Sequence, residues 1–276
     1  MILSGVAVAG LSFGLSVVGF DIIPWPVVAA LLGGGAISFM LYLRHARYVP
    51  APILDFSLLK LPTFRASLLG GFLFRIGVGA LPFLLPLLLQ VGFHLTPFQS
   101  GMITFTATLG ALGMKTSAAA ILKRFGFRTV LMVNALSSAL FIAACAIFSS
   151  TMPFAAMIAI LLVGGFFRSL QFTAVNAIAY AEVPVEKMSR ATSLSAVGQQ
   201  VSLSAGVAIS ALTVEIMGRL RGLPAIDASD FPAAFHVVGL ITAMSTFVFM
   251  RLPRDAGAEM ADRTPRDPDK SAQRPG

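Results

Sequence analysis

The sequence is poor in charge. Only 12% of its 276 residues are charged, about half of the roughly 25% that a soluble domain carries, while 57% are hydrophobic. A water-soluble globule of this length has too little interior to hide so much apolar surface. A soluble enzyme or soluble binding module is therefore excluded, and we expect an integral membrane protein.

Signatures of disulfides, metals and cofactors are also missing. The single cysteine, Cys145, lies inside an apolar run, which excludes a disulfide framework. The histidines His45, His94 and His236 are far apart, and no two have the spacing of metal ligands. The sequence contains neither a P-loop nor a G-x-G-x-x-G after a strand. We expect no metal and no cofactor.

Eight apolar runs divide the chain, each near the ~20 residues that a helix needs to cross a membrane. Proline, glycine and charged residues separate the runs. The pattern predicts an all-α integral membrane protein with about eight transmembrane helices. The expected spans are at about 2–20, 25–43, 66–90, 98–121, 129–148, 153–180, 191–216 and 234–250.

The net charge of +8 has a membrane explanation and does not indicate a nucleic-acid partner. If all eight spans are real, 15 of the 20 Lys and Arg residues fall on one side and two on the other. Loops with excess Lys and Arg face the cytoplasm. The bias therefore predicts that the 44–65 loop and both termini are cytoplasmic.

Three cations lie inside the expected spans: Arg75, Lys115 and Arg168. None of the 12 acidic residues lies deep in a span, so these cations have no buried carboxylate in this sequence. Intramembrane charges are costly and mark functional sites by default. Either the partner carboxylates are on a segment absent from this chain, or the cations line a cavity that receives an anion. Lys115 is close enough to the interface that snorkelling explains it equally well.

Amide side chains occur at similar depth in two of the expected helices. Gln171 and Asn176 share a helix with Arg168, and Gln199 and Gln200 lie about ten residues into the next span. A single buried amide is usually an interhelical hydrogen bond. With the helix of Arg75, polar residues lie at a similar depth in three helices, and this coincidence favours a common cavity. We expect it to be lined by Arg75, Lys115, Arg168, Gln171, Asn176, Gln199 and Gln200.

Three segments resemble the C-terminal part of a major facilitator superfamily transporter of the fourteen-span drug:proton antiporter type (EmrB/QacA-like). Residues 52–60, PILDFSLLK, are similar to the amphipathic connector that follows the two extra central spans of that family. Residues 119–128, AAILKRFGFR, resemble its cytoplasmic G-x-x-x-D-R-x-G-x-R loop. Residues 165–184, GFFRSLQFTAVNAIAYAEVP, with 190–193 and 199–206, resemble its twelfth and thirteenth helices.

The loop motif is incomplete in this chain. Arg124, Gly126 and Arg128 match the family pattern, whereas Ala119 replaces its glycine and Lys123 replaces its aspartate. The resemblance implies that the three matching residues form a cytoplasmic gating loop.

The resemblance also implies a domain layout. Residues 1–43 would be two linker helices, 44–65 a cytoplasmic connector and 66–252 the C-terminal six-helix transporter domain. Residues 253–276 are polar and rich in Pro, Asp and Arg, and we expect a disordered cytoplasmic tail. A six-helix N-terminal half with the family's proton-carrying acid would be missing from this chain.

The sequence leaves several functions open. The first is proton-coupled efflux of small organic compounds or drugs across a bacterial inner membrane, with this chain supplying one wall of the cavity. The alternatives are an exporter of anionic metabolites, and a truncated chain with no transport of its own. For a membrane enzyme, the sole His–Asp pair in reach is His45 and Asp55, which are ten residues and two prolines apart. That is not a catalytic spacing, so we do not expect an enzyme.

Overall fold

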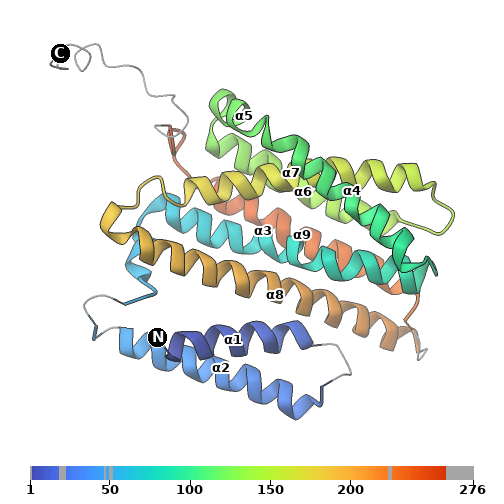
Figure 1. The fold of residues 1–276 in the computed structure, drawn as a ribbon, viewed down its shortest axis with the longest axis horizontal. Helices are drawn as coiled ribbons and strands as arrows, with labels where there is room; N and C mark the ends of the chain where they lie inside the picture. The colour runs from blue at the N-terminus through green and yellow to red at the C-terminus, as the bar shows by residue number, and fades with distance from the viewer. Residues whose placement is uncertain (1, 19–22, 47, 50–51, 223–225, 259–276) are drawn as a thin grey trace.

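The computed structural model describes residues 2–18, 23–46, 48–49, 52–222 and 226–258 (Figure 1). Within these residues the chain forms α-helices and short helical turns and contains no strand. The all-α prediction is confirmed. The α-helices are α1 (Ile2–Val17), α2 (Trp25–Ala46), α3 (Pro62–Leu87), α4 (Pro97–Lys115), α5 (Ala118–Phe125), α6 (Phe127–Ala144), α7 (Phe154–Ile178), α8 (Met188–Arg221) and α9 (Phe231–Phe249).

Six of the described helices are long and apolar enough to cross a membrane: α2, α3, α6, α7, α8 and α9. Helices α4 and α5 together form a seventh candidate that is bent by 61° at its break. Helix α1 has 16 residues and is shorter than an ordinary span. The chain is thus a multi-pass membrane protein whose helices follow the eight expected runs in order.

The run expected as one helix over 98–121 is divided in the structure. Helix α4 ends at Lys115, and Thr116 and Ser117 form a turn before α5 begins. The Thr116 hydroxyl donates a hydrogen bond to the Gly113 carbonyl oxygen, 3.1 Å away. Side chains of this kind compete with the backbone for helical hydrogen bonds, which explains a break that hydropathy did not reveal.

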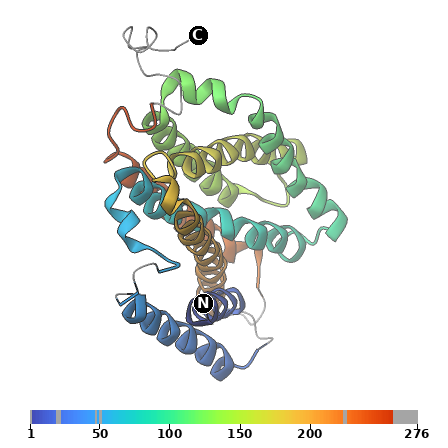
Figure 2. The same ribbon diagram turned by 60° about the vertical axis from the view of Figure 1, so that its left-hand side comes forward.

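The helices lie side by side in two groups (Figures 1 and 2). Helices α3 to α9 form one body, and α1 and α2 form a hairpin beside α8. The hairpin is closely packed, because a Cβ added to Gly35 would be 2.8 Å from the backbone nitrogen of Leu11. The hairpin meets the larger body mainly through α1, whose Ser16 hydroxyl donates to Ser204 of α8 at 3.2 Å.

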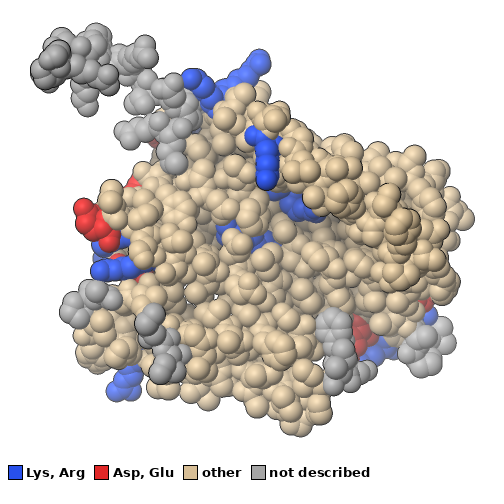
Figure 3. Space-filling view, in the orientation of Figure 1, with Lys and Arg blue, Asp and Glu red and all other residues tan. Residues whose placement is uncertain are grey.

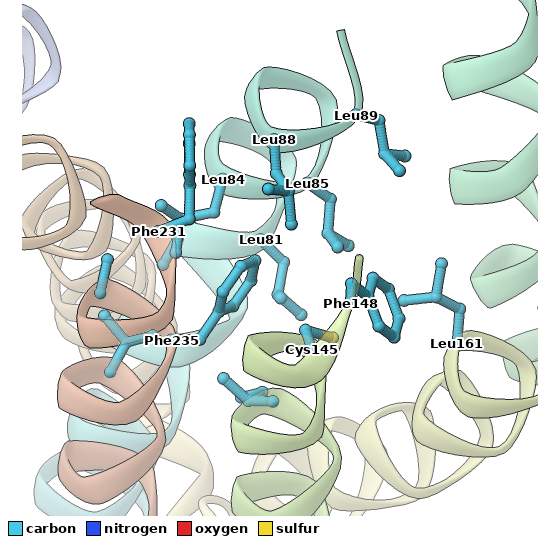
Figure 4. Close-up of a cluster of buried hydrophobic side chains, with 14 of the residues drawn as sticks. Leu81, Leu84, Leu85, Leu88, Leu89, Cys145, Phe148, Leu161, Phe231 and Phe235 are labelled. Atoms are coloured by element: carbon cyan, nitrogen blue, oxygen red, sulfur yellow. The ribbon is translucent and has the colours of Figure 1, made fainter. Parts of the chain in front are cut away.

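One buried apolar cluster fills the right-hand half of the larger body. In Figure 4, leucines of α3 point toward Cys145 at the end of α6, Leu161 of α7, and Phe231 and Phe235 of α9. Cys145 is buried and its sulfur donates to the Phe141 carbonyl oxygen at 3.3 Å. The cysteine is therefore a packing residue of this cluster.

The loops at the two ends of the bundle differ in charge. The described turns 52–61, 179–187 and 250–258 lie at the left end in Figure 1, and 93–96, 148–153 and 226–230 lie at the right end. The left-end turns and the helix ends beside them carry Arg44, Lys60, Arg65, Lys123, Arg124, Arg128, Lys187, Arg190, Arg251 and Arg254. The right end carries Arg219 and Arg221. We refer to the left end below as the basic end.

The connector is fastened to the loop between α7 and α8 at this basic end. Its 3₁₀ turn η1 (Phe56–Lys60) begins after Asp55, whose carboxylate accepts a hydrogen bond from the Ser57 backbone N–H at 2.9 Å. The same carboxylate is 3.8 Å from Lys187 Nζ and 3.6 Å from an Arg190 guanidinium nitrogen. Nearby, Glu182 accepts hydrogen bonds from the backbone and hydroxyl of Thr63 at the start of α3.

Replacing Asp55 by asparagine is expected to destabilise the protein by about 1 kcal/mol at neutral pH, the size of a partly exposed ion pair. Burial raises the pKa of Asp55, but the Ser57 hydrogen bonds and the two cations outweigh it and hold that pKa below its ordinary 3.8. A lowered folded-state pKa contributes stability above 3.8, and this stability is lost as the pH falls through the folded-state value.

Melting temperatures of purified wild type and Asp55→Asn should therefore differ at pH 7 and converge below pH 3.8. Glu186→Gln, an exposed carboxylate on the same loop, is the control and should melt like the wild type at neutral pH. A difference that persists unchanged in acid would show that the Asp55 charge is not responsible.

The segment after α9 begins as a packed turn. Leu252 is buried, and a Cβ added to Gly257, whose φ is +72°, would contact Phe127 and Ile178. Residues 253–258, which the sequence assigned to a disordered tail, are therefore ordered turns in the structure. The rest of that expected tail, 259–276, lies outside the described residues.

Candidate functional site

Helices α3 and α7 approach each other in the half of the bundle nearer the basic end. The Ser67 hydroxyl donates to the Val175 carbonyl oxygen at 2.7 Å. A Cβ added to Gly71 would be 2.7 Å from both an Arg75 guanidinium nitrogen and a Val175 methyl group. The missing side chain at Gly71 therefore provides the space in which the Arg75 guanidinium lies, one helical turn from its own backbone.

Arg75 is almost completely buried, with 2% of its surface exposed. One guanidinium nitrogen donates to the Asn176 side-chain oxygen at 2.8 Å. The guanidinium carbon is 5.3 Å from the ring centroid of Phe172, within cation–π range. Among the described residues, Arg75 Nε has no hydrogen-bond partner. The buried cation is thus held by an amide and a ring.

Gln171 and Arg168 lie on the same helix, but their side chains are placed differently. Gln171 is fully buried, and neither its nitrogen nor its oxygen has a hydrogen-bond partner within the described ranges. Arg168 is half-buried and lines a narrow cavity with Ser138 of α6 and Cys145, the residue after α6. The free volume of this cavity is only about 10 Å³, room for about one water molecule.

The remaining residues expected in the cavity lie on other helices. Gln199 is half-buried and Gln200 exposed, both on α8, which packs against α3. Lys115 is exposed at the end of α4. The structure thus brings Arg75 and Asn176 into contact, and within the described residues no hydrogen bond or ion pair joins Lys115, Gln199 or Gln200 to them. Whether all seven residues face one cavity stays a prediction.

One broad face of the molecule is mostly uncharged. Figure 3 shows this face almost uniformly uncharged, with basic atoms in a shallow hollow at its centre and most other charges at its edges. A face of this kind is suited to form one wall of a polar cavity between two transmembrane bodies.

The three residues expected in the gating loop join α5 to α6. Gly126 has φ +77° and ψ 158°, a conformation that only glycine adopts without strain, and its N–H donates to the Leu122 carbonyl oxygen at 2.9 Å. Arg128 donates to the Met250 carbonyl oxygen at 2.9 Å, which joins this loop to the end of α9. Arg124 is exposed, with its guanidinium carbon 5.5 Å from the Phe125 ring centroid.

Sequence reasoning missed several members of the polar interior. Asn134 and Ser138 of α6 are buried, and the Asn134 nitrogen and the Ser138 hydroxyl have no partner in the part of the chain that the structure describes. Their spacing of four residues, which places them on one helix face, was the available signal. Nothing in the sequence indicated that Phe172 would contact a cation, because phenylalanine is common throughout the chain.

The residues around Arg75 and Arg168 are better suited to binding a ligand than to catalysis. Among the described residues no three His, Cys, Asp or Glu side chains gather as a metal site. The described acids lie in loops or near helix ends, away from Arg75 and Arg168. A fixed cation, unpartnered amides and an uncharged face can hold a small organic molecule in a wall of low polarity.

Known proteins resemble this chain in sequence. The Major Facilitator Superfamily matches residues 67–274. Proteins named "Putative multidrug resistance protein MdtD" from Salmonella typhimurium (strain LT2), Salmonella heidelberg (strain SL476) and Salmonella paratyphi A (strain ATCC 9150) are each 33% identical over 249 residues. Each alignment covers 86% of this chain and 51% of the relative. The chain thus spans about half the length of the curated relatives it matches.

Proposed function

Because the chain belongs to the Major Facilitator Superfamily, we propose that it supplies one half of a transporter that exports small organic compounds or drugs across a bacterial inner membrane. The relatives' name refers to multidrug resistance, and they match most of this chain. Transporters of this kind bind substrate near the bilayer midplane, between two repeats that rock against each other. Helices α3 to α9 would form one repeat, residues 44–65 the connector, and α1 and α2 the linker.

The observation that carries the proposal is the Arg75 site. Arg75 is 2% exposed and lies in a helix long and apolar enough to cross the membrane, so its burial costs free energy. Here it joins two helices that each would line the cavity, through Asn176 and Phe172. Such a residue can respond to substrate by changing the contact between α3 and α7.

Proton coupling would depend on a second half. The described acids are far from the middle of the spans, so a proton-carrying carboxylate would come from an N-terminal six-helix half. With the basic end in the cytoplasm, as the positive-inside rule requires, α9 ends in the cytoplasm and the loop around Gly126 faces it. Arg124, Gly126 and Arg128 would then belong to the cytoplasmic gate.

Export of anionic metabolites is the second candidate, and it is favoured by Arg168, which has no ion pair with the acids in the described part of the chain. The geometry gives it less support than drug efflux. Arg75 already contacts Asn176, and the cavity beside Arg168 is about 10 Å³, far below the size of an organic anion.

The proposal is tested by efflux of a fluorescent lipophilic dye from bacteria that lack their own drug exporters. The chain is expressed alone, and together with the first six helices of one of the Salmonella relatives. We expect dye efflux from the paired chains, and we expect a protonophore to abolish it. Paired chains that both reach the membrane but export none of a broad panel of dyes and drugs would contradict the proposal.

A further inference from the structure

An apolar pocket lies between the linker hairpin and the larger body. Its walls come from α1, α2, the connector, α3 and α8, and it has a volume of about 250 Å³. Its lining consists of Ala, Val, Leu, Phe and Gly side chains throughout. The pocket is therefore a built cavity between five segments, distinct from the Arg75 site between α3 and α7.

The position of the pocket along the helices is defined by its lining. Phe72 is ten residues from the start of α3, Phe39 seven from the end of α2 and Val201 thirteen from the start of α8. At 1.5 Å per residue these are about 10 to 20 Å from the helix ends. All three ends are at the basic end of the bundle (Figure 1). The pocket thus lies in one leaflet, between that interface and the middle of the membrane.

The chemistry of the lining restricts the occupant. Pockets for drug-sized ligands usually measure about 300–1,000 Å³ and contain a few polar groups that orient the ligand. This pocket is smaller and offers none. Leu69 in its lining is 49% exposed, so the cavity opens to the outer surface of α3, a helix long and apolar enough to cross a membrane. A flexible hydrocarbon chain satisfies these conditions.

Charged residues lie at the end of the pocket nearest the interface, where the headgroup of a lipid would be. The lining residues Leu54 and Phe56 flank Asp55, which is shared by Lys187 and Arg190. One carboxylate thus faces two cations whose side chains are 41% and 32% exposed. Lys60, at the end of the same 3₁₀ turn, is also exposed. Glu182 and Glu186 on the same loop offset part of this charge, but together with Arg44 and Arg65 the basic end beside the pocket has five cations and three carboxylates. The small positive excess attracts anionic headgroups.

We propose that an anionic phospholipid binds here, with an acyl chain in the apolar pocket between the linker hairpin and helices α3 and α8, and its phosphate beside Lys187. The lipid would fill the space between the hairpin and the larger body. It would join α1 and α2 to the larger body at the end where the connector is fastened. This site goes beyond the proposed drug efflux and does not depend on it.

The experiment uses the purified chain in mild detergent with phosphatidylglycerol that carries a photoactivatable group in the middle of one acyl chain. After irradiation, mass spectrometry locates the label. We expect it to be concentrated in residues 68–72 and 194–201. Unlabelled phosphatidylglycerol should compete about fivefold better than phosphatidylcholine, the effect of roughly one basic residue near the headgroup.

Two pairs of variants refine the test. Val197→Trp fills the pocket and should remove most of the labelling, whereas Leu212→Trp, on the same helix but outside the pocket, should not. Lys187→Gln should remove the preference for the anionic lipid, and Lys123→Gln should retain it. The labelling pattern of the wild type decides the question even if Val197→Trp fails to fold.

Label spread evenly over the lipid-facing helices would overturn the proposal, as would full labelling of a folded Val197→Trp variant. Equal competition by phosphatidylcholine would overturn the anionic headgroup. None of these measurements depends on transport, so their failure is distinguishable from a failure of the proposed efflux function.

Discussion

Replacing Gly110 by alanine is expected to remove most of the folded protein. A Cβ at this position would be 1.9 Å from the Leu162 carbonyl oxygen, where α4 and α7 are in closest contact. The obstacle is backbone, so no side-chain rotation relieves it and the two helices must separate. Overpacking of this kind costs about 3 kcal/mol or more, a large part of the stability of a folded chain. Size-exclusion chromatography and melting in mild detergent measure the effect.

Gly113 provides the matched control on the same helix. A Cβ added there meets no atom within 4 Å, so Gly113→Ala should melt at or above the wild-type temperature, as alanine favours helix. Gly165→Ala approaches the same interface from α7, where a Cβ would be 2.1 Å from the Ala107 carbonyl oxygen, and should repeat the loss. Equal stability of Gly110→Ala and Gly113→Ala would show that α4 and α7 are not packed this closely.

Hydropathy predicted the existence and order of the helices because the apolar runs are long and the breaks between them are polar or rich in proline. It did not predict the bend at Thr116 and Ser117, since the apolar pattern continues through Ala118 and Leu122. It also did not predict the length of α8, which extends from Met188 to Arg221, beyond the 191–216 that the apolar pattern marked. A search for apolar runs does not include the polar residues at the ends of a helix.

For the candidate site, the sequence indicates the depth of a residue in the membrane but not the direction in which its side chain points. Counting residues from a loop gives the height of a side chain in the membrane, whereas its contacts depend on rotation about the helix axis. The Arg75–Asn176 contact joins residues 101 apart, and no local pattern specifies it. Gly71 is the partial signal, because a glycine one turn before a buried arginine leaves room for its side chain.

Arg75→Met and Asn176→Leu are expected to differ in stability, with Asn176→Leu the less stable of the two. Removing Asn176 leaves a buried cation without its hydrogen-bond acceptor, which costs about 2–3 kcal/mol for a charged group. Replacing Arg75 by methionine removes the charge together with its desolvation penalty, so it is expected to be neutral or slightly stabilising. Melting temperatures of the purified variants measure both, and the double variant Arg75→Met/Asn176→Leu should be more stable than Asn176→Leu alone.

Efflux separates a functional cation from a structural one. In the paired-chain assay Arg75→Met should fold normally yet export dye about tenfold more slowly, equivalent to roughly 1.4 kcal/mol. Arg251→Met, which removes an exposed cation just after α9 at the basic end, is the control and should retain export. If Arg75→Met destabilises the protein as much as Asn176→Leu, the cation is mainly structural. If Arg75→Met folds and exports at the wild-type rate, transport does not depend on this cation. The buried Arg75 then no longer supports the proposed function.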